Sequence, residues 1–112
     1  MSVLTLQYSA DADRLQARVR SSEASEVVRV QQDKVALDID RARKRVVAFE
    51  VADFRHFVSY QLLDQLFGDK VVQKIAAFQS AAVRTLKSED QIQFMTLPSS
   101  NRRTVERLLR AA

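Results

Sequence analysis

The stretch that decides the fold runs from residue 28 to residue 58 and reads VRVQQDKVALDIDRARKRVVAFEVADFRHFV. Two segments of it alternate apolar residues with polar or small ones, a period of two that is typical of half-buried strands. The apolar positions are Val35, Leu37, Ile39, Val47, Phe49 and Val51. The charged residues between the two segments, 40–45, predict an exposed turn. The stretch therefore indicates a β-hairpin that leads into a helix.

Shorter segments before this hairpin show the same alternation. Residues 3–8 and 15–20 predict two strands joined by a polar turn, and residues 27–30 predict a third strand. Together with the hairpin, the first 53 residues are expected to form an antiparallel meander of four or five strands. Such a sheet has one apolar face that must be covered, and the rest of the chain is the candidate cover.

Helical spacing begins after the hairpin. Apolar residues three and four positions apart predict one helix over 54–67 and a second over 70–87. We expect Asp53 to cap the first helix and Asp69 to cap the second, with Gly68 at the turn between them.

The remaining residues contain one ambiguous segment and one clear helix. A capping-box pattern at Ser88 favours a short helix over 88–97, whereas the alternation of Ile92 and Phe94 is typical of a strand; we expect the helix. After Pro98, a polar run supplies a cap. A last amphipathic helix then runs to the C-terminus with arginines on its outer face.

Length and composition indicate one globular α+β domain over residues 1–112. A chain of this length with 46% hydrophobic and 29% charged residues can bury a single core. We expect residues 1–53 to form the meander and residues 54–112 to form three or four helices. The sequence has no cysteine, no apolar run that could span a bilayer and no signal-peptide pattern. We therefore expect a cytoplasmic protein with no membrane partner.

The net charge of +4 lies in the second half of the chain, because cations and acids balance over residues 1–53. Two groups of cations mark the predicted turn and the last helix. They are Arg41, Arg43, Lys44, Arg45, Arg102, Arg103, Arg107 and Arg110. Such groups can neutralise phosphates, so they are candidate contacts with nucleic acid or another acidic partner; the alternative is a solvated surface. No aromatic stacking platform is expected on an exposed strand, so binding would be electrostatic and weakly sequence-selective.

Little in the sequence favours catalysis or a metal site. His56 is the only histidine, and the simpler interpretation is an exposed helix residue. The carboxylates Asp38, Asp40, Glu50 and Asp53 could hold a hard cation, but cross-strand pairs with neighbouring arginines explain them as well. A single glycine cannot build a phosphate-binding loop. We assign no catalytic, cofactor-binding or metal-binding residue and expect no cofactor.

The helix expected over 54–67 is apolar on more than one side, which a small sheet cannot cover completely. The residues concerned are Phe54, Phe57, Tyr60, Leu63 and Phe67. They predict a protein interface and a homo-oligomer, with a further protein partner as a second option.

A set of residues in the predicted sheet matches a short family motif. The residues are Tyr8, Ala12, Asp13, Leu15, Leu37, Asp38, Asp40, Phe49, Glu50, Val51 and Asp53. In this respect the segment 6–53 resembles a small bacterial and archaeal family, the domain of unknown function numbered 2283. The resemblance covers less than half of the chain. It implies an interaction protein rather than an enzyme, because some members are suspected to be one half of toxin–antitoxin-like gene pairs.

The sequence therefore predicts a non-enzymatic interaction or regulatory module that forms oligomers, with the antitoxin-like half of a bacterial gene pair as the role that the resemblance implies. The alternative is a nucleic-acid-binding protein that uses the turn 41–45 and the basic C-terminal helix. A small hydrolase or metal-dependent enzyme built around Asp38, Asp40 and His56 ranks behind both.

Overall fold

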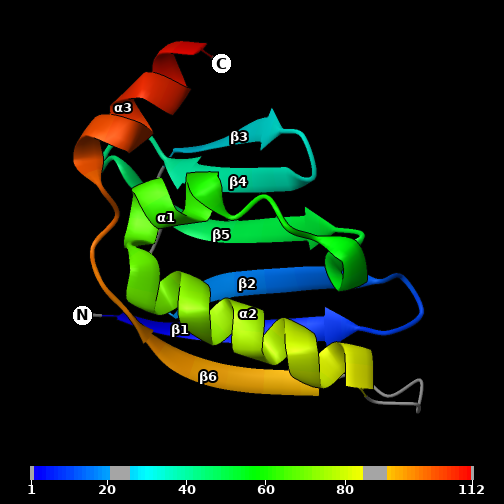
Figure 1. Cartoon of the computed structure of the whole chain (residues 1–112). Helices are drawn as coiled ribbons and strands as arrows, with labels where there is room; N and C mark the ends of the chain where they lie inside the picture. The colour runs from blue at the N-terminus through cyan, green and yellow to red at the C-terminus, as the bar shows by residue number, and fades with distance from the viewer. Residues whose placement is uncertain (1, 21–25, 85–90, 112) are drawn as a thin grey trace.

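A computed structural model describes residues 2–20, 26–84 and 91–111, which form a six-stranded antiparallel sheet with helices on one face (Figure 1). The strands are β1 (Ser2–Ser9), β2 (Arg14–Arg20), β3 (Val27–Gln32), β4 (Val35–Asp40), β5 (Arg45–Ala52) and β6 (Gln91–Leu97). The helical elements are a 3-10 turn, η1 (Phe54–His56), and the α-helices α1 (Gln61–Phe67), α2 (Asp69–Arg84) and α3 (Arg102–Ala111). The α+β class is confirmed.

The strand order, β3-β4-β5-β2-β1-β6, differs from the predicted meander. β2 and β3 follow each other in the chain but are not neighbours, because β5 pairs with β2 and joins the β3–β4–β5 meander to the β1–β2 hairpin. β6 pairs with the free side of β1. The sheet therefore contains a strand from the part of the chain that was expected to be helical.

The prediction of a helix over 88–97 is wrong for residues 91–97, which form β6. The alternation of this segment suits a strand, because Met95 and Leu97 are buried under the helices while Ile92 and Phe94 lie on the opposite face. The start of the capping-box pattern, residues 88–90, lies outside the described residues.

The β4–β5 hairpin forms as predicted, with one irregularity. The register shifts at Asp38/Ile39, so that Asp38 lies opposite Ala48 and Ile39 lies opposite Val46. This leaves Val47 as an extra residue, and Val46 takes the buried position that was expected for Val47.

The predicted helix over 54–67 is interrupted. Asp53 has a positive φ of 51° and makes no capping hydrogen bond, so its predicted role is wrong; it pairs instead with Lys34, with 2.7 Å between Nζ and Oδ2. The chain is extended at Phe57 before α1 begins. Gln79 of α2 holds this break, because its Nε2 donates to the carbonyl oxygens of Phe54 (2.7 Å) and Phe57 (2.6 Å).

The later helix boundaries follow the sequence more closely. Gly68 ends α1 with a positive φ of 93°, and its N–H donates to the carbonyl of Asp64. Asp69 is the first residue of α2 rather than its cap, and α2 is described as far as Arg84. Oδ1 of Asn101 accepts from the backbone N–H of Thr104 at 3.1 Å, which confirms the predicted polar cap of the last helix.

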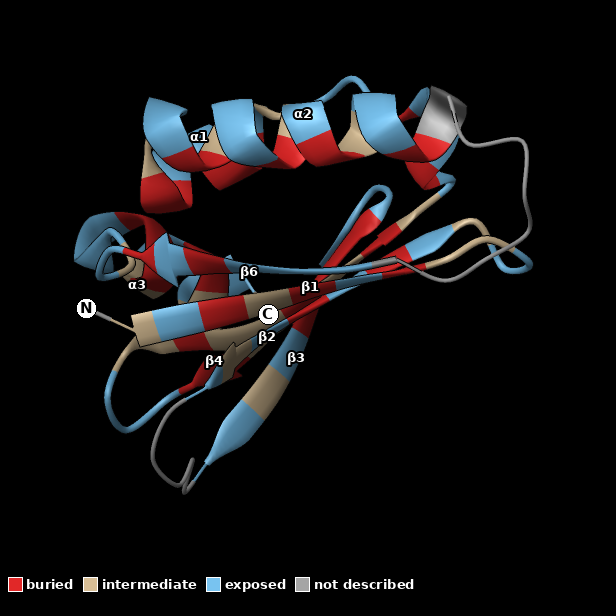
Figure 2. Ribbon diagram, turned by 90° about the horizontal axis from the view of Figure 1, so that it is seen from below, coloured by how far each residue is buried: buried red, intermediate tan, exposed pale blue. Residues whose placement is uncertain are grey.

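The core lies between the sheet and the layer formed by α1 and α2 (Figure 2). Strand residues on this side, such as Leu4, Leu6 and Leu37, have no exposed surface, and Ile75 of α2 is equally buried. The opposite side of the sheet carries no helix in the described structure (Figure 2). We call it the open face; its residues include Val3, Thr5, Gln7, Gln16, Arg18, Arg29, Asp38, Glu50, Ile92 and Phe94.

Candidate functional site

Two basic segments that are far apart in the sequence meet at one end of the molecule. The turn between β4 and β5 lies beside the start of α3 (Figure 1). Nζ of Lys44, the last residue of this turn, donates to Oε1 of Glu106 in α3 at 3.1 Å. Nε of Arg102 lies 3.5 Å from the same oxygen. Glu106 therefore connects the turn to the helix.

Two surface hollows show which cations share this end. One, of about 370 Å³, has Arg43, Lys44, Arg45 and Arg102 in its lining. The other, of about 560 Å³, is lined by Arg41, Lys44, Glu106, Leu109 and Arg110. We call the cations of the two hollows the basic end: Arg41, Arg43, Lys44, Arg45, Arg102 and Arg110. Six of the eight candidate cations found in the sequence, from both groups, thus share one surface.

The two other candidate cations of α3 behave differently. Arg103 is exposed next to Arg102 but lines neither hollow. Nη2 of Arg107 donates to Oε1 of Gln65 in α1 at 2.7 Å. Arg107 is thereby turned toward α1 and away from the basic end.

Two carboxylates lie at or near the basic end, and they have different roles. The hydrogen bond from Lys44 and its positive charge lower the pKa of Glu106 below its ordinary value, so Glu106 is ionised at neutral pH and offsets part of the field. Asp40 was expected in an exposed turn but has no exposed surface, which corrects that prediction. Its Oδ1 accepts from the backbone N–H of Ala42 at 3.1 Å, so it shapes the turn.

The predicted apolar interface on 54–67 is mostly core. Phe54, Phe57, Leu63 and Phe67 expose 0, 5, 0 and 6% of their surface. The break between η1 and α1 lets these side chains pack under α2 and against the sheet, so the surplus of apolar surface that suggested an interface is absent here. Tyr60 is half-buried, and its hydroxyl donates to Oε1 of Gln79. Burial raises the pKa of Tyr60 to about 12.

Exposed apolar side chains lie instead at one margin of the open face. Ile92 and Phe94 of β6 expose 61 and 62% of their surface, and Val3 of the neighbouring strand exposes 40%. Phe94 is therefore an exposed aromatic residue on a strand, a position that was not expected from the sequence. The alternation of residues 92–96 was the sequence signal for these positions, but the helix assignment concealed it.

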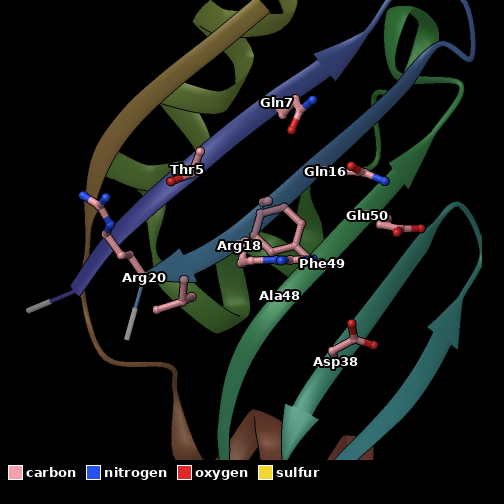
Figure 3. A pocket seen from close by; sticks show the side chains of 11 residues that line it. Thr5, Gln7, Gln16, Arg18, Arg20, Asp38, Ala48, Phe49 and Glu50 are labelled. Carbon is pink, nitrogen blue, oxygen red and sulfur yellow. The ribbon is translucent and has the colours of Figure 1, made fainter. Parts of the chain in front are cut away.

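The middle of the open face is polar. A shallow hollow of about 520 Å³ is lined by side chains that include Gln7, Gln16, Arg18 and Glu50 (Figure 3). Arg29 of β3 donates to Asp38 at 3.2 Å and to Glu50 at 2.9 Å. These two carboxylates of the candidate cation set are therefore occupied in cross-strand ion pairs.

The other members of the candidate catalytic and metal set are dispersed. Asp53 pairs with Lys34, Asp40 is buried in its turn, and His56 is exposed in η1. Across residues 2–20, 26–84 and 91–111, no group of three or more histidine, cysteine or acidic residues is arranged to hold a metal ion.

A partly buried polar cluster lies at the opposite end of the sheet from the basic end. The hydroxyl of Tyr8 donates to Oδ1 of Asp13 at 2.8 Å, and Nε of Arg55 donates to the Tyr8 oxygen at 2.9 Å. The backbone N–H of Arg55 also donates to Oδ1 of Asp13. Burial, followed by the bond to Asp13, raises the pKa of Tyr8. The cluster joins the β1–β2 turn to η1 and has a structural role.

Comparisons with models of known protein families, with characterised proteins and with solved structures found no match to this chain. The resemblance of residues 6–53 to the family numbered 2283 therefore stays a prediction. None of the described helices is long and apolar enough to cross a bilayer.

Proposed function

We propose that this protein is a non-enzymatic binding module whose basic end binds the phosphate backbone of nucleic acid. The observation that supports this proposal is the meeting of the turn 41–45 and α3 through Glu106. Six cations from two distant segments then share one surface, and Glu106 is the one carboxylate among the described residues that line its two hollows. A concentration of charge of this kind attracts polyanions and releases their counterions on binding.

The chemistry of the cations favours phosphate as the partner group. All of them except Lys44 are arginines, whose planar guanidinium can donate two parallel hydrogen bonds to a phosphate. The surface of the basic end is also concave, because Lys44 lines both of its hollows. Contacts with the backbone alone carry no sequence information, so we propose binding with weak sequence selectivity.

The test compares two double variants that each remove two positive charges. Arg41→Ala with Arg110→Ala changes the basic end, whereas Lys70→Ala with Lys74→Ala changes exposed cations on α2. Binding to a labelled DNA or RNA duplex is followed by fluorescence anisotropy over a series of salt concentrations. The first variant should weaken binding and lower the slope of log K against log salt by about two, one for each phosphate that it no longer neutralises. The second should bind like the unmodified protein.

Three results would contradict the proposal. One is the absence of salt-dependent binding to any duplex or single strand at low ionic strength. Another is an equal loss of affinity in both double variants, which would indicate a general effect of net charge. The third is equal binding of polyglutamate at matched charge, which would point to an acidic protein as the partner instead.

A further inference from the structure

β6 is an edge strand whose outer side is not paired within the described part of the chain. It pairs with β1 along its whole length, from Gln91 to Leu97, and ends the sheet on that side. The backbone N–H and C=O groups that point away from β1 can therefore accept another strand.

The residues of β6 lack the features that usually prevent edge pairing. Its sequence, QIQFMTL, contains no charged residue and no proline. The opposite edge, β3, is protected in two ways: Arg29 lies in the middle of the strand, and α3 packs near it. Charged side chains and covering helices are the common protections of an edge, so β6 is better suited to edge pairing than β3.

Three of the five exposed large hydrophobic residues in the described part of the chain lie at this same edge; the other two are Val27 of β3 and Val58. Ile92 and Phe94 project from β6 on the open face, and Val3 of β1 lies diagonally beside Phe94, because Val3 is opposite Thr96 and Thr5 is opposite Phe94. Single exposed apolar side chains are common in soluble proteins, but a group of three beside an uncharged edge indicates an interaction surface.

From these observations we infer that β6 pairs antiparallel with β6 of a second copy and joins two sheets into one. The strand is compatible with itself because no charge is opposed to a like charge in any register. One symmetric register places Ile92 opposite the partner subunit's Phe94, and the reverse, which forms two aromatic–aliphatic cross-strand pairs. The twofold axis is perpendicular to the sheet, so the helices of both copies stay on the same side.

This dimer is independent of the proposed function, since β6 contributes no cation to the basic end. The basic ends of the two copies would lie at opposite corners of the joined sheet. The two proposals can therefore fail separately: a monomer could still bind nucleic acid, and a dimer could form in a protein that does not bind it.

The experiment measures molar mass by light scattering on a dilution series that starts at millimolar chain concentration. The unmodified protein should have about twice the 12.8 kDa mass of one chain at the high end of the series. Phe94→Lys should be a monomer, because the dimer would place one lysine from each copy at the β6–β6 interface, where their like charges repel each other. The matched control, Val58→Lys, replaces a more exposed valine between η1 and α1 and should remain a dimer.

A second measurement uses the unmodified protein, so it does not depend on the folding of a variant. Hydrogen exchange at residues 91–97 should slow as chain concentration rises, while exchange in β3 should not change. A monomeric mass throughout the series would overturn the inference. So would a dimer that persists in Phe94→Lys, or exchange at residues 91–97 that does not respond to concentration.

Discussion

Gln79 is a single side chain on which three segments depend. Its Nε2 donates to two carbonyl oxygens, those of Phe54 and Phe57, and its Oε1 accepts from the hydroxyl of Tyr60. At the interruption between η1 and α1, Gln79 gives the Phe57 carbonyl its hydrogen-bond partner, whereas the Phe54 carbonyl also accepts from the Phe57 N–H at 3.2 Å. A polar group deprived of its partner in such a place costs more than the bond itself is worth.

Gln79→Ala should therefore lower the free energy of unfolding by about 1 to 3 kcal/mol, the usual cost of leaving buried polar groups unsatisfied. Gln73→Ala is the matched control, because Gln73 lies on the exposed side of the same helix and bonds only to Asp69 in the described structure. The control should change the free energy by less than about 0.5 kcal/mol. Urea denaturation followed by circular dichroism measures both, and equal effects would show that Gln79 does not hold the break.

Residue patterns in the sequence indicated most of the buried positions in β1 to β5, since the period of two is a local property, but they missed the shift from Val47 to Val46. They did not indicate that the helix over 54–67 would be interrupted. The bonds that stabilise the interruption come from Gln79, more than twenty positions further along the chain. A local pattern contains no information about such a partner.

At the scale of elements, the contact between the β4–β5 turn and α3 depends on one carboxylate. Lys44 and Arg102 both approach Oε1 of Glu106. The acid orients the cations of the two elements toward each other, but it also opposes the binding of phosphate. Neutralising Glu106 should therefore lower the stability of the fold and raise the affinity for phosphate.

Glu106→Gln should bind a nucleic-acid duplex several-fold more tightly than the unmodified protein, because one negative charge leaves the basic end. It should also be slightly less stable at neutral pH. The sign follows from the pKa of Glu106, which is lowered in the folded protein: the ion pair stabilises above the ordinary pKa and is lost as pH falls through the folded value. Denaturation measured from neutral to acidic pH should show the free energies of unfolding of the variant and of the unmodified protein converging as pH falls. Weaker binding of nucleic acid by Glu106→Gln would contradict the role assigned to Glu106.

The assignment of β6 shows how two local signals can compete. A capping-box pattern and a strand-like alternation overlap in residues 88–97, and nothing in the sequence alone decides between them. The choice is made by the rest of the fold, because β1 offers an unpaired edge and the helical layer offers a place for Met95 and Leu97. The same contacts leave Ile92 and Phe94 exposed.

For the whole molecule, the sequence predicted the class of the fold and both groups of cations, but not their meeting. The turn and α3 are about sixty residues apart, and their contact depends on β5 lying in the middle of the sheet and on α3 folding back over its end. The order of the strands is not encoded in any local pattern. The interface predicted over 54–67 is not exposed for a related reason: its phenylalanines are buried against other parts of the same chain.

Binding of nucleic acid at the basic end is tested most directly by a nuclear magnetic resonance titration. The ¹⁵N-labelled protein is titrated with a short DNA duplex at low salt. Shifts should be concentrated in residues 41–45 and 102–110 and should disappear as salt is added, because contacts with phosphate are screened. Shifts confined to the open face, around Arg18 and Gln16, or no shifts at all, would contradict the assignment of the basic end as the binding surface.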